Sequence, residues 1–130
     1  FEKAYKSHGL ERSLKRPVSR DVYEQIRVSI EMNNRIYGLI GLCMKAGKVL
    51  SGNEQVEKGI RKGKGYLLIL AADSSEQDEE DYVLAAERHH LPYRIFGTKE
   101  MLGQALGKGV RTAVLITDRG FARAMLTKLE

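Results

Sequence analysis

The feature that most constrains the fold is an unbroken apolar run, Tyr66–Ala72. The run has the length of a β-strand, and it lacks the alternation of a strand with one face in water. A strand that is apolar on both sides needs cover on both faces of its sheet. The run therefore predicts a central strand of a covered sheet.

Helix and strand signals alternate along the chain from residue 34 onward. Three further segments of strand length are Lys48–Leu50, Leu91–Phe96 and Thr112–Thr117. The stretches between the strands carry apolar residues at helical spacing, so helices are expected there. This alternation is typical of an α/β sandwich, with helices on both faces of a mixed or parallel sheet.

Capping residues predict several helix boundaries. A helix with Ile36 and Ile40 on its buried face should end at Gly47, because glycine is favoured just past a helix C-terminus. Thr98 and Asp118 stand where the last two helices should begin, and both residue types cap helix N-termini. The helix opened by the acidic segment 73–81 is expected to bury Val83, Leu84 and Ala86.

Residues 1–33 have irregular helical spacing of apolar residues, unlike the regular pattern of the rest of the chain. They predict a helical appendage ahead of a main domain, which comprises residues 34–130. Pro17 interrupts the first helical pattern, and a second helix is expected after it. Met32–Asn34 should form a loose joint to the main domain. Because the chain opens at Phe1 without a methionine, we expect it to be a fragment of a longer protein.

The segment Ser51–Gly63 is predicted to form a helix with two unlike faces. Val56 and Ile60 stand four residues apart and form a narrow apolar stripe. Ser51 followed by Glu54 has the form of a capping box at the start of this helix. The polar face consists of Glu54, Gln55, Lys58 and Lys62. This face lies beside the N-terminal amides of the helix, and such amides attract phosphate. The face could therefore bind an anion, or it could be an ordinary solvated surface.

Charge is unevenly distributed within the overall net charge of +5. Between Arg35 and Gly65 there are seven basic residues and two acidic ones. Between Asp73 and His90 there are seven acidic residues and one arginine. The first segment could therefore meet a polyanion, and the second should face away from any nucleic acid.

Catalytic and metal-binding motifs are missing from the sequence. Gly47–Lys48 and Gly107–Lys108 lack the other residues of a phosphate-binding P-loop. Cys43 is the single cysteine, and the pair His89–His90 stands far from it in sequence, so we expect neither a disulfide nor a metal site. The sequence therefore predicts a protein without enzymatic activity and without a cofactor.

No apolar run reaches the length that a bilayer requires, and nothing resembles a signal peptide. A single cysteine is also compatible with a reducing compartment. We therefore expect a cytoplasmic protein.

A resemblance to a known family runs from about Arg35 to the C-terminus. Its strongest part is Leu42–Lys58, which resembles the bacterial YlxQ/YbxF-type members of the ribosomal protein family that binds kink-turn RNA. Further matches in the same order are Leu67–Asp73, Leu91–Tyr93, Thr98–Gly103 and Gly109–Thr117. The resemblance implies a three-layer α/β/α sandwich with a four-stranded mixed sheet.

The same resemblance implies which residues contact RNA. The family signature begins at a glycine and continues into the following helix, where two polar residues touch sheared G·A pairs and a lysine reaches the RNA. By position, the glycine is Gly52 and the lysine is Lys58, and the two polar residues are Glu54 and Gln55. A second contact loop, which packs against unstacked nucleotides in the family, matches Val110–Thr112. The full predicted RNA-binding set is Lys48, Gly52, Asn53, Glu54, Gln55, Lys58, Lys62, Val110, Arg111 and Thr112.

The chain departs from the archaeal and eukaryotic members of that family at one pair of positions. Those members carry Asn-Glu where this chain carries Glu54–Gln55, a pair that resembles the bacterial members. A carboxylate can accept hydrogen bonds from guanine but cannot donate, whereas Gln55 can do both. Recognition of purine edges is therefore still expected, although Glu54 places a negative charge beside phosphates.

Residues 1–33 are similar to a different family, the small YlxR-type bacterial proteins. The segments Phe1–Tyr5 and Leu10–Ser19 resemble the C-terminal part of those proteins. The cysteines and the Arg-Gly-Ala motif of their preceding part do not occur here. We therefore expect a fusion of the two families, of which the first contributes its tail.

The hypothesis that follows is a bacterial, non-enzymatic RNA-binding protein that recognises kink-turn-like RNA. The RNA would be ribosomal or riboswitch-like, with association to the ribosome, and the protein would act as a monomer. Two alternatives stay open. The domain could be the recognition part of an RNA-modifying enzyme, or the N-terminal helices could form a protein-docking module.

Overall fold

A computed structural model describes residues 20–129, and it describes the side chains of residues 31–129. Contacts divide the chain into two compact units, residues 1–33 and residues 34–130. The helices are α2 (Arg20–Lys45), α3 (Asn53–Arg61), α4 (Glu76–Arg88), α5 (Lys99–Leu106) and α6 (Arg119–Leu129). The strands are β1 (Val49–Ser51), β2 (Leu67–Leu70), β3 (Tyr93–Ile95) and β4 (Ala113–Ile116). The first predicted helix, before Pro17, lies outside the described residues.

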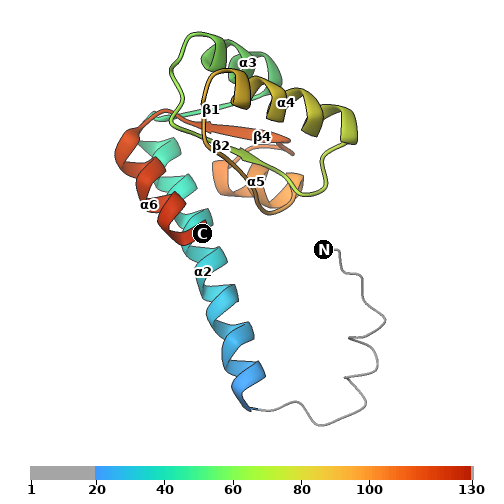
Figure 1. Ribbon diagram of the computed structural model, residues 1–130. Coiled ribbons are helices and arrows are strands. Elements are labelled where there is room, and N and C mark those ends of the chain that lie inside the picture. The colour runs from blue at the N-terminus through green and yellow to red at the C-terminus, as the bar shows by residue number, and fades with distance from the viewer. Residues whose placement is uncertain (1–19, 130) are drawn as a thin grey trace. The chain divides into compact units, whose positions relative to one another are not determined.

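The four strands of the second unit form one mixed sheet in the order β1-β4-β2-β3 (Figure 1). β4 is antiparallel to both β1 and β2, and β2 is parallel to β3. β2 lies inside the sheet, and all its residues are buried, as the apolar run at Tyr66–Ala72 predicted. The mixed four-stranded sheet confirms the predicted fold class.

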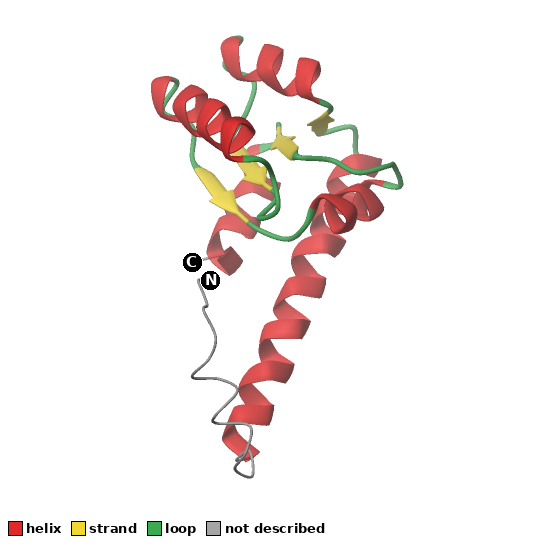
Figure 2. Ribbon diagram, turned by 90° about the vertical axis from the view of Figure 1, so that its right-hand side faces the viewer, coloured by secondary structure: helices red, strands yellow, loops and turns green. Residues whose placement is uncertain are grey.

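Helices cover both faces of the sheet, so the domain has three layers (Figure 2). Because successive strand residues point to opposite faces, β2 and β4 each contribute to two cores. The core beneath α2, α5 and α6 contains Ile36, Ile40, Cys43, Leu67, Ile69, Ala71, Leu102, Leu106, Val114, Ile116, Ala122 and Met125. The core beneath α3 and α4 contains Val56, Ile60, Leu68, Leu70, Tyr82, Ala86, Leu91, Ala113 and Leu115.

The prediction of a loose joint at Met32–Asn34 is wrong, because α2 is a continuous helix from Arg20 to Lys45. The joint was inferred from two adjacent asparagines. Asparagine is only a moderately poor helix former, and the segment contains neither glycine nor proline, so nothing in it forces the hydrogen-bond ladder to break. The change in composition therefore coincides with the boundary between the two units at residues 33 and 34, but no helix ends there.

Three other predicted helix boundaries, at Gly47, Thr98 and Asp118, are confirmed by their hydrogen bonds. Gly47 has a φ angle of 72°, and its N–H donates to the carbonyl of Met44 at the end of α2. Thr98 Oγ1 accepts a bond of 3.1 Å from the backbone N–H of Met101. Asp118 Oδ2 accepts a bond of 2.9 Å from the backbone N–H of Phe121.

The buried face of α4 differs from the prediction. Leu84 is 52% exposed, and the buried residues are Tyr82 and Ala86, with Val83 half-buried beside them. Tyr82 and Ala86 stand four residues apart on one side of the helix, whereas Leu84 is two positions from each and points away. Periodicity alone favours the aliphatic residues. It gives no sign that a tyrosine with many acidic neighbours is buried.

In the described part of the chain, no helix is long and apolar enough to cross a membrane.

Candidate nucleic-acid interface

The turn from β1 to α3 places the first group of predicted site residues. Ser51 is the last residue of β1 and is paired with Val114 of β4. Gly52 follows with φ 93° and ψ 132°, a conformation that residues with a side chain rarely adopt, and α3 begins at Asn53. A Cβ atom at Gly52 would meet no described atom within 4 Å, so the backbone is open to close approach.

The capping box predicted for Ser51 and Glu54 is wrong. Gly52 is the N-cap residue of α3, and among the described residues no side chain bonds the helix start. Ser51 cannot serve as the cap because it still belongs to the strand. As a consequence, the first amides of α3 are left for an external acceptor, which is the arrangement that attracts anions.

The inner face of α3 packs tightly on the sheet. Val56, Gly59 and Ile60 are buried, which confirms the predicted apolar stripe. A Cβ atom at Gly59 would lie 2.7 Å from side-chain carbons of Leu50 and Leu115. The absence of a side chain at Gly59 therefore lets α3 lie close against the sheet, so the polar side of the helix is held rigidly.

The outer face of α3 carries the predicted polar residues. Glu54, Gln55, Lys58 and Lys62 are all exposed. A shallow hollow of about 180 Å³ runs along this side of the helix, and it is lined by Leu50, Gln55, Lys58, Gly59, Lys62 and Lys64. The hollow therefore combines an amide, three ammonium groups and a small apolar floor.

Asn53 is held by a residue that sequence reasoning missed. The hydroxyl of Tyr82 donates a hydrogen bond of 2.7 Å to Asn53 Oδ1, 29 positions away in sequence. Burial, together with the carboxylates of Glu57, Asp78 and Asp81, raises the pKa of Tyr82 to about 12. Tyr82 is therefore neutral at physiological pH and remains a donor. No local pattern could have paired these residues, because α3 and α4 meet only in the folded domain.

The second predicted segment is the loop between α5 and β4. Gly107 ends α5 in the left-handed conformation. The Nη1 of Arg111 donates to the backbone oxygens of Val110, at 2.9 Å, and Gly109, at 3.3 Å. The backbone N–H of Arg111 donates to the carbonyl of Lys99 at 3.0 Å. These bonds hold the loop while Val110 leaves 64% of its surface exposed.

The sheet register brings the two segments together. Because Ser51 pairs with Val114, the end of β1 lies beside the start of β4 and therefore beside the loop at Val110–Thr112. The Nε of Arg111 donates to Ser51 Oγ at 3.3 Å and links them directly. Lys48 is not part of this group, because it precedes β1 and lies at the opposite end of the strand from Gly52.

Within the described residues, no group of three or more histidine, cysteine or acidic side chains could hold a metal ion. Cys43 is buried, and its thiol donates to the carbonyl of Lys48 at 3.2 Å. Burial raises the pKa of Cys43 to about 11, with a further contribution from Asp118. The thiol is therefore a packing group and a poor nucleophile.

The fold and the site together define a class of protein: a small α/β/α sandwich that presents a glycine-led helix start and a neighbouring loop at one end of a mixed sheet. Comparison with known proteins gives the family. The chain belongs to the ribosomal protein L7Ae/L30e/S12e/Gadd45 family, which matches residues 34–126.

Individual relatives agree with this assignment. The chain is 32% identical over 94 residues to the RNA-binding protein YlxQ of Bacillus subtilis (strain 168), covering 72% of this chain and 94% of that protein. It is 26% identical over 114 residues to the large ribosomal subunit protein eL8 of Methanobrevibacter smithii, covering 86% and 93% of the two chains.

Two solved structures are similar to this one. A protein with unknown function from Bacillus halodurans superimposes with a TM-score of 0.70 at 30% identity, covering 72% of this chain and 95% of that one. A 15.5kD RNA binding protein of Giardia lamblia superimposes with a TM-score of 0.65 at 23% identity, covering 76% and 88%. The second likeness supports the fold alone.

Proposed function

We propose that this protein binds structured RNA of the kink-turn type through the start of α3 and the loop at Val110–Thr112. The observation that carries the proposal is the direct junction between these two segments, made by the Arg111–Ser51 hydrogen bond and the β1–β4 register. Both segments match the RNA-contacting regions implied by the family resemblance. The name of the Bacillus subtilis relative also supports an RNA ligand.

Each element has a chemical role in this proposal. The amides at the start of α3 bind a backbone phosphate, because no side chain of the described residues bonds this helix start and Gly52 leaves the approach open. Lys58 binds a second phosphate from the exposed face of the helix. Glu54 accepts from guanine N–H groups at the sheared G·A pairs, and Gln55 both donates and accepts.

The loop supplies a different kind of contact. Val110 presents an exposed apolar surface, on which an unstacked base can pack without a hydrogen-bond requirement. Recognition then depends on the bent shape of the RNA and on a few base edges, as in most protein contacts to non-helical RNA. The protein binds the kinked conformer better than the extended one and shifts the RNA population toward it.

The RNA class is ribosomal or riboswitch-like, and the protein acts without catalysis, as a cytoplasmic monomer in a ribonucleoprotein. The positive charges of Lys58, Lys62 and Lys64 on one side of α3 favour a polyanion. The carboxylate of Glu54, on the same helix, gives base specificity at some electrostatic cost.

The test is a titration against two RNAs: a short kink-turn RNA, and the same RNA with its G·A pairs replaced by Watson–Crick pairs. Both titrations are made at two salt concentrations. We expect a preference for the kinked RNA that persists at the higher salt, because edge contacts do not depend on counterion release. Equal binding of both RNAs that fades with salt would instead mean that the basic surface is a non-specific electrostatic patch.

A further inference from the structure

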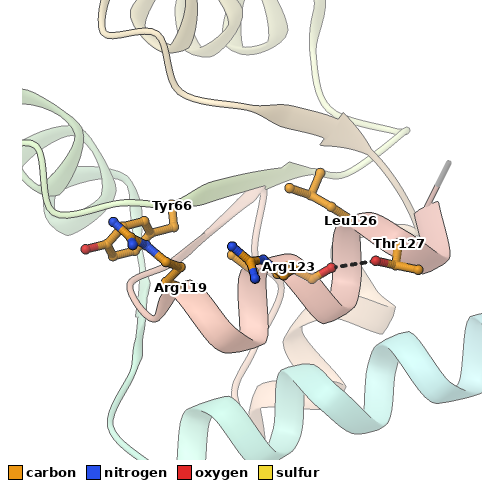
Figure 3. A pocket seen from close by; sticks show the side chains of 6 residues that line it. Tyr66, Arg119, Arg123, Leu126 and Thr127 are labelled. Carbon is orange, nitrogen blue, oxygen red and sulfur yellow. Dashed lines mark hydrogen bonds between the residues drawn. The ribbon is translucent and has the colours of Figure 1, made fainter.

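A second hollow lies at the other end of the sheet from the Gly52 turn, between the start of β2 and the outer face of α6 (Figure 3). Its volume is about 400 Å³. The lining residues are Tyr66, Arg119, Ala122, Arg123, Leu126 and Thr127. The proposed function uses none of them.

The polar part of this hollow is an aromatic ring beside two guanidinium groups. Tyr66 is 41% exposed, and Arg119 Cζ lies 5.5 Å from the centre of its ring, which is the geometry of a cation–π pair. Arg123 is exposed one helical turn further along α6 and extends toward the same space (Figure 3). The nearby carboxylate of Asp118 is engaged in capping α6 through the Phe121 amide.

This combination fits a nucleotide. Aromatic rings and arginine planes are the surfaces on which proteins stack unpaired bases, and arginine binds phosphate with a bidentate fork. Ala122 and Leu126 add an apolar floor. A stacking group, a phosphate-binding group and an apolar floor therefore lie within one hollow.

A row of exposed lysines runs from the proposed kink-turn site toward the end of the sheet at which the hollow lies, although α3 and α6 cover opposite faces of the sheet. The N–H of Tyr66 donates to the carbonyl of Ile116, which pairs with Val49 at the start of β1, so Tyr66 lies at the opposite end of the sheet from Ser51. α3 has 9 residues and spans about 13 Å between these ends. Exposed lysines follow the same path at positions 58, 62 and 64, and Lys48 precedes β1 at the Tyr66 end.

We propose that this hollow is a second RNA-binding site, which holds a single-stranded nucleotide flanking the kink. The base stacks on the layer formed by Tyr66 and Arg119, and its phosphate binds Arg123. The proposal rests on the proposed function, because it assigns a further contact to the same RNA. It also gives Lys48, which lies away from the Gly52 turn, a position along the RNA path.

The experiment compares the kink-turn RNA with and without single-stranded tails at either end, using the full chain. Wild-type protein should bind one tailed RNA about tenfold more tightly than the untailed RNA, since one stacked base contributes roughly that factor. Tyr66→Ala and Arg123→Ala should lose this gain and keep the affinity for untailed RNA. Tyr66→Phe should retain it, and Arg88→Ala, which removes an exposed charge from α4, should behave as wild type.

The two proposals fail in different ways. The second site is disproved if the tail gives no gain in affinity. It is also disproved if the gain survives in both Tyr66→Ala and Arg123→Ala. Loss of the preference for kinked over Watson–Crick RNA contradicts the proposed function instead. In that case, the affinities for tailed and untailed Watson–Crick RNA are compared in the same variants, and this comparison still tests the second site. Thermal unfolding shows whether each variant is folded. If Tyr66→Ala is not folded, Arg123→Ala, which changes an exposed residue, still decides the test.

Discussion

Arg111 and Ser51 lie 60 positions apart in sequence, and a hydrogen bond of 3.3 Å joins Arg111 Nε to Ser51 Oγ. The same guanidinium group donates to the backbone oxygens of Val110 and Gly109. One side chain therefore shapes the loop before β4 and attaches it to the end of β1. This arginine, together with the β1–β4 register, sets the relative position of the two halves of the proposed RNA site.

Arg111→Lys keeps the positive charge but cannot reproduce this set of bonds, because an ammonium group lacks the planar fork of a guanidinium. We expect the free energy of unfolding to fall by about 1 kcal/mol, the usual net value of a hydrogen bond. Affinity for the kinked RNA should fall by about tenfold if the loop position matters. Chemical denaturation and RNA titration measure the two effects, and unchanged RNA affinity would show that RNA binding does not depend on the hydrogen bonds of Arg111.

Lys58→Ala should weaken RNA binding with little loss of stability, because an exposed lysine contributes little to packing. We expect an affinity loss of about tenfold, as for one charge-assisted contact. The slope of affinity against salt should also fall by about 1 on logarithmic axes. Arg35→Ala, an exposed charge on the helix that covers the other face of the sheet, is the matched control. Equal effects of both variants would mean that net charge alone is responsible.

Gly52→Ala should destabilise the domain by about 1–3 kcal/mol, the range for a strained backbone conformation. The cause would be backbone strain at φ 93°, since a Cβ there would meet no described atom within 4 Å. Gly38→Ala provides the comparison, because Gly38 lies within α2 and a Cβ there has equally open space. That variant should stabilise by about 0.5–1 kcal/mol through helix propensity. Similar values for both substitutions would disprove the strain at Gly52.

Tyr82→Phe removes the hydrogen bond to Asn53 and should cost about 1 kcal/mol of stability. It should also change the response to alkaline pH. The pKa of Tyr82 rises from 10.0 to about 12 on folding, so the folded state holds its proton more tightly. This contribution to stability is complete below pH 10 and is lost as the pH rises toward 12.

Unfolding measured between pH 8 and 12 should therefore show a shallower decline for Tyr82→Phe than for wild type, since the variant lacks this titration. Some decline should remain in the variant, because the pKa of Cys43 is also raised, from 9.0 to about 11. Identical slopes for the two proteins would contradict a buried, neutral Tyr82 hydroxyl.

The sequence was sufficient for the layers of the fold and insufficient for several local details. The apolar run at Tyr66–Ala72 and the alternation around it required a covered sheet, because burial on two faces has a direct compositional signature. The capping box at Ser51 was wrong, because a serine followed by a glutamate has the same spacing whether the serine ends a strand or caps a helix. The joint at Met32–Asn34 was wrong because asparagines weaken a helix without ending it.

The site was predicted in pieces, and only the tertiary structure joined them. Gly52–Lys58 and Val110–Thr112 were identified by their resemblance to a family, as two separate segments. Their contact depends on the pairing of Ser51 with Val114, a strand register that local patterns do not encode. The bond between Tyr82 and Asn53, and the hollow between Tyr66 and α6, likewise arise from packing between distant segments. Periodicity and composition determine which residues are buried, whereas register and packing determine which exposed residues become neighbours.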